Sequence, residues 1–371
     1  MEQLRNGCRN NQTGHSAYLP SVFLPASFLL CLIFAFLTGS AFGTCGTLGI
    51  ALMVMSASFS IPLLTTAGAV ITGTYFGYVF SPLSDYNNLA AGLAEKDIPA
   101  FISCQLKVTA PSAIICLAVY AVMNLQIDSS VGSIQDSAVF VDEIGQIFKG
   151  GLINYLPLVI VLVIMLLRKP TLIAIFSGIV SGALLSIFYQ GNSFSDVIGA
   201  IWSGASVSAD NQLIASIFSR GGMQSMSGVS ILFILAFCLM GILNTCNITE
   251  VIMAPVESKI NGIFSAAIYT FAITFIINAM SASGITSCVI VLGFMLPVYM
   301  QKKIDVSILL TVTTIGGILA TLVIPWHSNC VNPASFLGIN PSDMITIIFA
   351  PWVAAIVCAV YLILKKLSLK N

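Results

Sequence analysis

The 371-residue sequence predicts an all-α fold, a polytopic transmembrane helical bundle, and three observations favour this class. Hydrophobic residues make up 57% of the chain and charged residues 8%, whereas soluble globular domains carry about 25% charged residues. Apolar runs of about 20 residues recur along the whole chain, and each is long enough to cross the hydrocarbon core. The alternating ten-residue segments that are typical of a transmembrane β-barrel do not occur.

Eleven apolar segments are candidate spans, so we expect about 10–11 spans. They cover residues 21–38, 40–58, 61–80, 106–125, 151–168, 171–190, 227–246, 262–282, 284–300, 305–325 and 344–364. The three longest polar connections between them are 82–105, 126–150 and 191–226. We divide the chain into a polar N-terminal segment (1–20), a first repeat region (21–125), connecting helices and loops (126–226) and a second repeat region (227–371).

The basic residues of the short loops orient the chain, because such loops are enriched in Lys and Arg on the cytoplasmic side. Alternating the eleven spans places four basic clusters on one side: Arg168-Lys169, Lys259, Lys302-Lys303 and Lys365-Lys366. The same count places the N-terminus outside, where Arg5 and Arg9 fit poorly. Either an odd number of further spans precedes this chain, or residues 21–58 form a re-entrant hairpin.

Composition also bears on other classes of function. Lys and Arg together number 14, as do Asp and Glu, and no basic arm is present, so nucleic-acid binding has no electrostatic support. Ten cysteines occur without a CxxC pair, so a disulfide framework or a cysteine metal site has little support. No Walker loop or HExxH motif is present. We therefore expect no enzyme and no cofactor.

The segment 73–88 carries the strongest functional signal. A glycine-rich apolar helix breaks at Pro82, and four oxygen-bearing side chains follow: Ser84, Asp85, Asn87 and Asn88. Broken helices at membrane depth occur where they are buried in protein or line a cavity, and hard cations prefer oxygen ligands. The pattern predicts a Na⁺ site with Asp85 at its centre, and a desolvated Asp85 could also trade a proton for the cation. The alternative is a helix-capping Asp in a surface loop.

A shift of 243 residues superposes two regions of the chain. Ser40 falls on Ser283, Thr44 on Ser287, Gly73 on Gly316, Pro82 on Pro325 and Asp85 on Ser328. In the alternating arrangement the two copies cross the membrane in opposite directions. Inverted repeats with broken helices are typical of secondary transporters, whose substrate site lies where the repeats meet. The predicted lining residues are Ser40, Thr44, Ser283, Ser287 and Asn329, although small residues of this kind also serve tight helix packing.

His327 follows Pro325-Trp326 and is a candidate proton relay, because histidine titrates near neutral pH. It fits equally well as a boundary residue beside an interfacial tryptophan. A rival hypothesis pairs His327 with Ser283 as a serine–histidine dyad for intramembrane proteolysis.

Four sequence blocks resemble the NhaC-type Na⁺/H⁺ antiporters. Residues 38–44 with 46–52 look like the T-G-[ST]-x-[WF]-G-T…G-I-A-L signature, and residues 73–90 resemble the block G-x-x-F-G-D-x-x-S-P-L-S-D-T-T-N-L-A. Residues 221–226 are similar to G-G-M-x-S-M, and residues 323–326 to L-I-P-W. The resemblance implies an ion-transporter fold with inverted repeats and Na⁺-coupled exchange. Some members exchange organic acids such as malate and lactate.

The chain also departs from the family pattern. Tyr78 stands where the family has Asp, Tyr86-Asn87 where it has Thr-Thr, residues 314–317 where it has Glu-Asp-Ser-Gly, and His327 where it has Asn. Three membrane carboxylates are therefore missing and only Asp85 remains, which puts simple Na⁺/H⁺ exchange in doubt. The chain is also short at its N-terminus relative to the family.

We therefore predict a secondary active transporter of the bacterial cytoplasmic membrane that couples Na⁺ movement to H⁺ or solute exchange. Asp85 is the predicted Na⁺ ligand, supported by Ser84, Asn87 and Asn88. One alternative is a Na⁺-coupled organic-anion or amino-acid carrier, in which a half-helix N-terminus faces a substrate carboxylate. Another is a degenerate relative that does not transport. The predicted partners are the lipid bilayer, Na⁺, H⁺ and, for the carrier, a small carboxylate.

Overall fold

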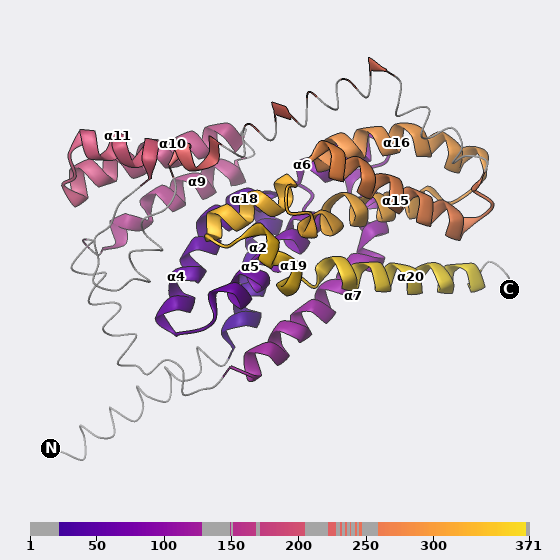
Figure 1. Cartoon of the computed structure of the whole chain (residues 1–371), viewed down its shortest axis with the longest axis horizontal. Helices are drawn as coiled ribbons and strands as arrows, with labels where there is room; N and C mark the ends of the chain where they lie inside the picture. The colour runs from indigo at the N-terminus through magenta and orange to yellow at the C-terminus, as the bar shows by residue number, and fades with distance from the viewer. Residues whose placement is uncertain are drawn as a thin grey trace, which may run out of the picture.

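The computed structural model describes residues 22–127, 149, 151–167, 171–204, 222–227, scattered positions between 231 and 246, and 259–368. Every regular element within these residues is helical (Figure 1). Seven of the described helices are long and apolar enough to cross a membrane. The predicted class, a multi-pass helical membrane protein, is confirmed.

The first repeat begins with a helical hairpin. Its arms are α2 (Phe23–Thr38) and, after Gly39, a continuous helix made of α3 (Ala41–Thr44), the π-helical turn η1 (Cys45–Gly49) and α4 (Ile50–Ser58). The rings of Phe23 and Phe59 meet edge to face with centroids 5.7 Å apart, so the two arms run antiparallel. A broken helix and a long helix follow: α5 (Leu63–Phe80), α6 (Asp85–Leu93) and α7 (Ile98–Leu125).

The second repeat has the same sequence of elements. Its hairpin consists of α15 (Ile263–Ser281) and α16 (Gly284–Gln301). Its broken helix consists of α17 (Val306–Thr314), η5 (Ile315–Leu319), η6 (Ala320–Val323) and α18 (Ser328–Leu337). The last elements are η7 (Pro341–Asp343), α19 (Met344–Ile347) and α20 (Ala350–Ser368).

The helix boundaries of the two repeats coincide under the shift of 243 residues. The pairs are the ends of α4 and α16 at Ser58 and Gln301, the starts of α5 and α17 at Leu63 and Val306, the starts of α6 and α18 at Asp85 and Ser328, and the ends of α7 and α20 at Leu125 and Ser368. The repeat that the sequence showed in a few residues therefore extends through whole helices.

The two repeats run in opposite directions. Helix α2 starts beside the C-terminal end of α7, where the backbone N–H of Leu24 donates to Oδ1 of Asn124 over 2.9 Å. Helix α15 starts beside the C-terminal end of α20, where the ammonium of Lys366 lies 5.2 Å from the ring centroid of Phe264. Because α20 ends beside the start of α17, and the start of α17 contacts the early part of α7, these are opposite ends of the bundle.

Each hairpin ends at the level of the break in its own repeat. Ser81 Oγ donates to the Phe36 carbonyl in the first repeat, and Trp326 Nε1 donates to the Ala279 carbonyl in the second, both over 2.7 Å. The 16 residues of α2 extend about 24 Å, less than the ~30 Å hydrocarbon core. Helix α2 is thus too short for a straight span, whereas Ala41–Ser58 is long enough for one, and the re-entrant hairpin stays a prediction.

One expected polar connection is instead largely helical. The stretch 82–105, expected as a polar connection, contains all of α6 and the first turns of α7. The candidate spans among the described residues include Ala41–Ser58 of the first hairpin and both arms of the second. The expected span 227–246 and the pair Arg168-Lys169 fall largely outside the described residues.

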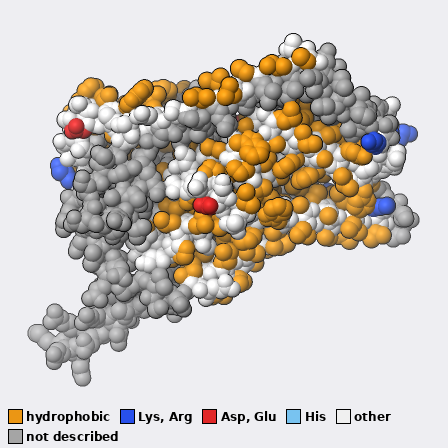
Figure 2. Space-filling view, in the orientation of Figure 1, with side chains coloured by type: hydrophobic (Ala, Val, Ile, Leu, Met, Phe, Trp, Pro, Cys, Tyr) orange, Lys and Arg blue, Asp and Glu red, His pale blue; other side chains and the backbone are white. Residues whose placement is uncertain are grey.

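The connecting helices form a group beside the repeats. They are η2 (Leu152–Tyr155), α9 (Leu156–Leu166), α10 (Thr171–Leu185), η3 (Ser186–Gln190) and α11 (Phe194–Ser203), and Figure 1 shows α9, α10 and α11 together at the upper left. Figure 2 shows hydrophobic side chains spread over the face of α15, α16 and α20, with blue Lys and Arg side chains near the ends of the view. This distribution is typical of a surface in contact with lipid.

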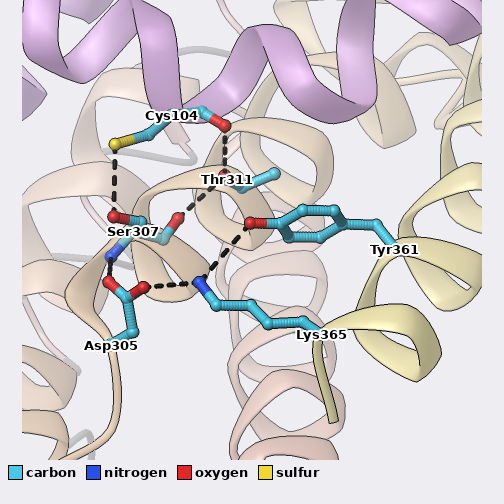
Figure 3. Close-up of polar contacts among 6 residues, drawn as sticks. All are labelled: Cys104, Asp305, Ser307, Thr311, Tyr361 and Lys365. Carbon is cyan, nitrogen blue, oxygen red and sulfur yellow. Dashed lines mark hydrogen bonds and ion pairs between the residues drawn. The ribbon is translucent and has the colours of Figure 1, made fainter. Parts of the chain in front are cut away.

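A polar network joins three helices at the end of the bundle where the lysines gather (Figure 3). Asp305, which caps α17, pairs with Lys365 of α20. Ser307 and Thr311 of α17 contact the thiol and the carbonyl of Cys104 in α7, over 3.2 and 3.3 Å. The network fixes the loop between α16 and α17 against both long helices.

Candidate functional site

A cavity of about 1520 Å³ lies where the hairpin tips and helix breaks of both repeats meet. Two further faces of it come from η2, α9 and α10. Its polar lining includes Ser40, Tyr78, Asp85, Asn88, Ser283, Ser328 and Asn329. The inverted repeats therefore share one cavity to which both contribute polar side chains, as a transporter site requires.

Asp85 is the one carboxylate among the described residues that line this cavity. It is the first residue of α6, and the capping position belongs to Ser84, whose Oγ accepts from the backbone N–H of Asn87. Oδ1 of Asp85 accepts hydrogen bonds from the Tyr78 hydroxyl and from the Tyr86 backbone N–H. Oδ2 accepts none from the described residues. One carboxylate oxygen is thus held in place and the other is available to a ligand.

The two hairpin tips place equivalent serines at the cavity. Ser40 and Ser283 are the N-caps of α3 and α16, and each Oγ accepts a backbone N–H three residues later, over 3.1 and 3.3 Å. The residue before each serine has a left-handed backbone, with φ of 68° at Gly39 and 52° at Ala282. The tips of the two repeats therefore share their turn geometry as well as their sequence position.

The remaining predicted ligands divide into two groups. Asn88 and Asn329 line the cavity, whereas Ser84, Asn87, Thr44 and Ser287 are fully buried and do not. The amide of Asn87 donates to the carbonyls of Val79 and Ser81, both over 2.8 Å, and so braces the unwound segment between α5 and α6. Cation binding by these side chains stays a prediction.

Comparison with known proteins decides the family. The sequence profile of the Na⁺/H⁺ antiporter family matches residues 73–366. The chain belongs to this family. It is 28% identical to the Na⁺/H⁺ antiporter NhaC of Bacillus subtilis (strain 168), over 94% of this chain and 77% of the relative.

Two similar relatives have names that include organic solutes. The chain is 26% identical to the malate-2H⁺/Na⁺-lactate antiporter of the same strain, over 92% of this chain and 73% of the relative. It is 30% identical to the arginine/ornithine antiporter ArcD of Halobacterium salinarum, over 86% of this chain and 66% of the relative. The predicted resemblance to NhaC-type proteins is confirmed, and the chain is a multi-pass membrane protein of an antiporter family.

The position at which this antiporter departs from the family block has a visible consequence. Tyr78 is buried, and its hydroxyl bonds to Asp85, seven residues later on the other side of the break. A hydroxyl donor thus stands where the family pattern has a second acid. The cavity consequently carries a single negative charge among its described lining residues.

The second break is capped by a different side chain. Nδ1 of His327 accepts from the Asn329 backbone N–H over 3.0 Å, so the ring proton is on Nε2, which lies 3.1 Å from Oδ1 of Asn278. Both ring nitrogens are therefore engaged, whereas Ser283 Oγ accepts from Thr286. The geometry does not form the serine–histidine dyad. The proton-relay role of His327 stays a prediction.

Three buried residues at the breaks were missed from the sequence. Gln105 of α7 donates to the Val79 carbonyl over 2.7 Å and thereby supports the first break. Tyr75 and Tyr86 reach across the repeats, donating to the carbonyls of Asn329 and Thr313, both over 3.0 Å. Gln105 gave no usable signal, because it lies in the stretch 82–105 that was expected as a polar connection. The tyrosines carry no signal that separates them from core residues.

Proposed function

We propose that this antiporter couples the movement of Na⁺ to exchange of H⁺ or a solute, with Asp85 as the cation ligand. The observation that carries the proposal is Oδ2 of Asp85, unengaged by the described residues and facing a cavity shared by both repeats. Asp85 is exposed to this cavity, and an ionisable group within a bundle of membrane helices is usually functional. In this proposal Na⁺ and H⁺ are transported ions, and the protein needs no further cofactor.

The surrounding groups supply the oxygen ligands that a hard cation prefers. Hydroxyls come from the hairpin tips, through Ser40 and Ser283, and amide oxygens come from Asn88 and Asn329. These groups originate from opposite repeats. A movement of one repeat against the other would therefore change the coordination of the ion, which is the basis of alternating access.

The test is transport in proteoliposomes that enclose a pH-sensitive dye. Asp85→Asn should reduce Na⁺-driven proton flux by at least about 100-fold, because the amide removes the only charge of the described lining. Asp343→Asn is the matched control, since Asp343 is exposed and outside the cavity lining. Wild-type flux in Asp85→Asn, with the same amount of inserted protein, would refute the assignment.

Solute exchange is the second candidate, because the cavity is much larger than one hydrated ion requires. The relatives named for malate and lactate and for arginine and ornithine make organic solutes reasonable cargo. Counterflow of labelled solutes without any Na⁺ or pH gradient distinguishes this candidate from pure ion exchange. If folded, inserted protein shows neither Na⁺-driven proton flux nor solute counterflow, the chain is instead a relative that does not transport.

A further inference from the structure

We propose that the cavity takes an organic cation, with an ammonium group on Asp85, rather than a carboxylate. The inference rests on the proposed function, because it uses the same cavity and the same acid. It extends that function by naming the charge class of the solute. Three features of the cavity favour a cation: the charge of its lining, the hydrogen bonds at the helix breaks, and its size and aromatic content.

The charge of the lining favours a cation. Among the described residues that line the cavity there is one carboxylate, Asp85, and no Lys, Arg or His. A carboxylate solute would enter a space of its own sign, and a desolvated anion without a partner is strongly unfavourable. An ammonium group would instead pair with Oδ2 of Asp85 in a charge-assisted hydrogen bond.

The helix N-termini at the two breaks already donate hydrogen bonds within the protein. In the first turn of α18, the backbone N–H groups of Ser328, Asn329 and Cys330 donate to the Ala282 carbonyl, the His327 ring and the His327 carbonyl. In α6, the N–H of Tyr86 donates to Asp85 itself. A carboxylate at either break would therefore have to displace a hydrogen bond before it gained one.

The size of the space suits an organic solute. Binding pockets for drug-sized molecules hold about 300–1,000 Å³, and this cavity, at about 1520 Å³, exceeds that range. Tyr75, Tyr78 and Tyr155 contribute aromatic rings to the lining. Aromatic faces attract ammonium groups, and the nearby amides of Asn88 and Asn329 offer acceptors for a second polar end.

Among the described residues, Lys149 is the one basic residue hydrogen-bonded to a residue of the cavity lining. The carbonyl of Lys149 accepts from the Asn154 amide at the edge of the cavity, but the Lys149 ammonium donates to the Tyr189 carbonyl. Lys149 itself does not line the space. Its charge is thus engaged away from Asp85.

Binding of three four-carbon probes to the full chain in lipid nanodiscs tests the inference. The probes are putrescine (a diamine), 1,4-butanediol (its neutral isostere) and succinate (a dicarboxylate), each titrated calorimetrically. Putrescine should bind at least about tenfold more tightly than the other two, because only it can pair with Asp85. Asp85→Asn should remove that preference, and Asp343→Asn should keep it.

The outcomes separate this inference from the proposed function when Na⁺/H⁺ flux is measured on the same preparation. Tighter binding of succinate, no putrescine binding, or equal putrescine affinity in Asp85→Asn would overturn the organic-cation inference even if ion flux is normal. Normal, Asp85-dependent putrescine binding without any Na⁺ or H⁺ flux would support the inference and overturn the ion-coupled function.

Discussion

The two helix breaks share their geometry and differ in their chemistry. The hairpin tips turn with the same backbone, and α6 and α18 start at equivalent residues. The first break has Ser84 as its cap and Asp85 as its first helical residue, whereas the second has His327 and Ser328. The duplicated fold thus builds the cavity from both sides, but among the described lining residues the charge comes from the first repeat alone.

The packing beneath the breaks differs as well. Gly73 of α5 lies so close to α2 that an added Cβ would meet the Phe28 carbonyl oxygen at 2.2 Å. Its equivalent Gly316 would place a Cβ 3.1 Å from the Thr274 side chain. At this pair of positions the first repeat therefore packs its broken helix against backbone, and the second packs it against a side chain.

The largest expected effect comes from moving the acid between repeats. Asp85→Ser should abolish Na⁺-driven flux, and adding Ser328→Asp should restore part of it, because residue 328 starts α18 in the same cavity. Full recovery is not expected. The equivalent of Tyr78 is Thr321, which bonds Asn329, so the new carboxylate has no matching phenol donor.

Na⁺-driven flux in proteoliposomes, normalised to the amount of inserted protein, measures the effect of moving the acid from residue 85 to residue 328. Ser328→Asp alone is the control, because it shows whether an acid at residue 328 lowers flux when Asp85 is still present. A double variant as inactive as Asp85→Ser, with unchanged thermal stability, would show that the site depends on the position of the acid and that the repeats are not interchangeable.

A smaller effect is expected from the packing difference. Gly73→Ala must push α2 away from α5, because its closest neighbour is backbone, and should cost about 1–3 kcal/mol. Gly316→Ala should cost less, since the Thr274 side chain can shift by a few tenths of an ångström. Thermal unfolding in detergent measures both. Gly92→Ala is the control, because a Cβ there meets nothing within 4 Å, and equal losses at Gly73 and Gly316 would contradict the comparison.

The membrane helices, the helix breaks and the repeat could be predicted because each leaves a local pattern in the sequence. Apolar length predicts membrane helices, proline predicts the breaks at Pro82 and Pro325, and the 243-residue shift predicts two copies. Length did not predict that α2 and α15 end beside the breaks, because both helices are apolar and only tertiary contacts place their ends there.

The composition of the site was harder to predict for a geometric reason. Successive residues of a helix point about 100° apart, so Asn87 faces the protein interior and Asn88 the cavity although they are neighbours. That division depends on how α6 is rotated against the rest of the bundle. Gln105 was placed in a polar connection because the start of α7 is polar, and only tertiary contacts bury it.

The smallest expected effect lies at the lysine-rich end of the bundle, where the repeats also differ. The pair Asp305–Lys365 of the second repeat corresponds to Pro62 and Val122 in the first, which cannot form one. Asp305→Asn should lower the free energy of unfolding at pH 7 by at most about 1 kcal/mol, because the pair is partly exposed.

The pH dependence of this loss follows from the pKa of Asp305. Burial raises that pKa, but hydrogen bonds from Lys365 and Ser307 and the Lys365 charge outweigh burial and lower it from 3.8 to about 2. A carboxyl whose pKa falls on folding stabilises the folded state above its unfolded pKa and loses that contribution as pH drops through the folded value. The difference between wild type and Asp305→Asn should therefore be constant above about pH 5 and shrink between about pH 4 and 2. Lys365→Met should cost a similar amount, and the double variant should cost less than the sum of the two if the pair acts as a unit.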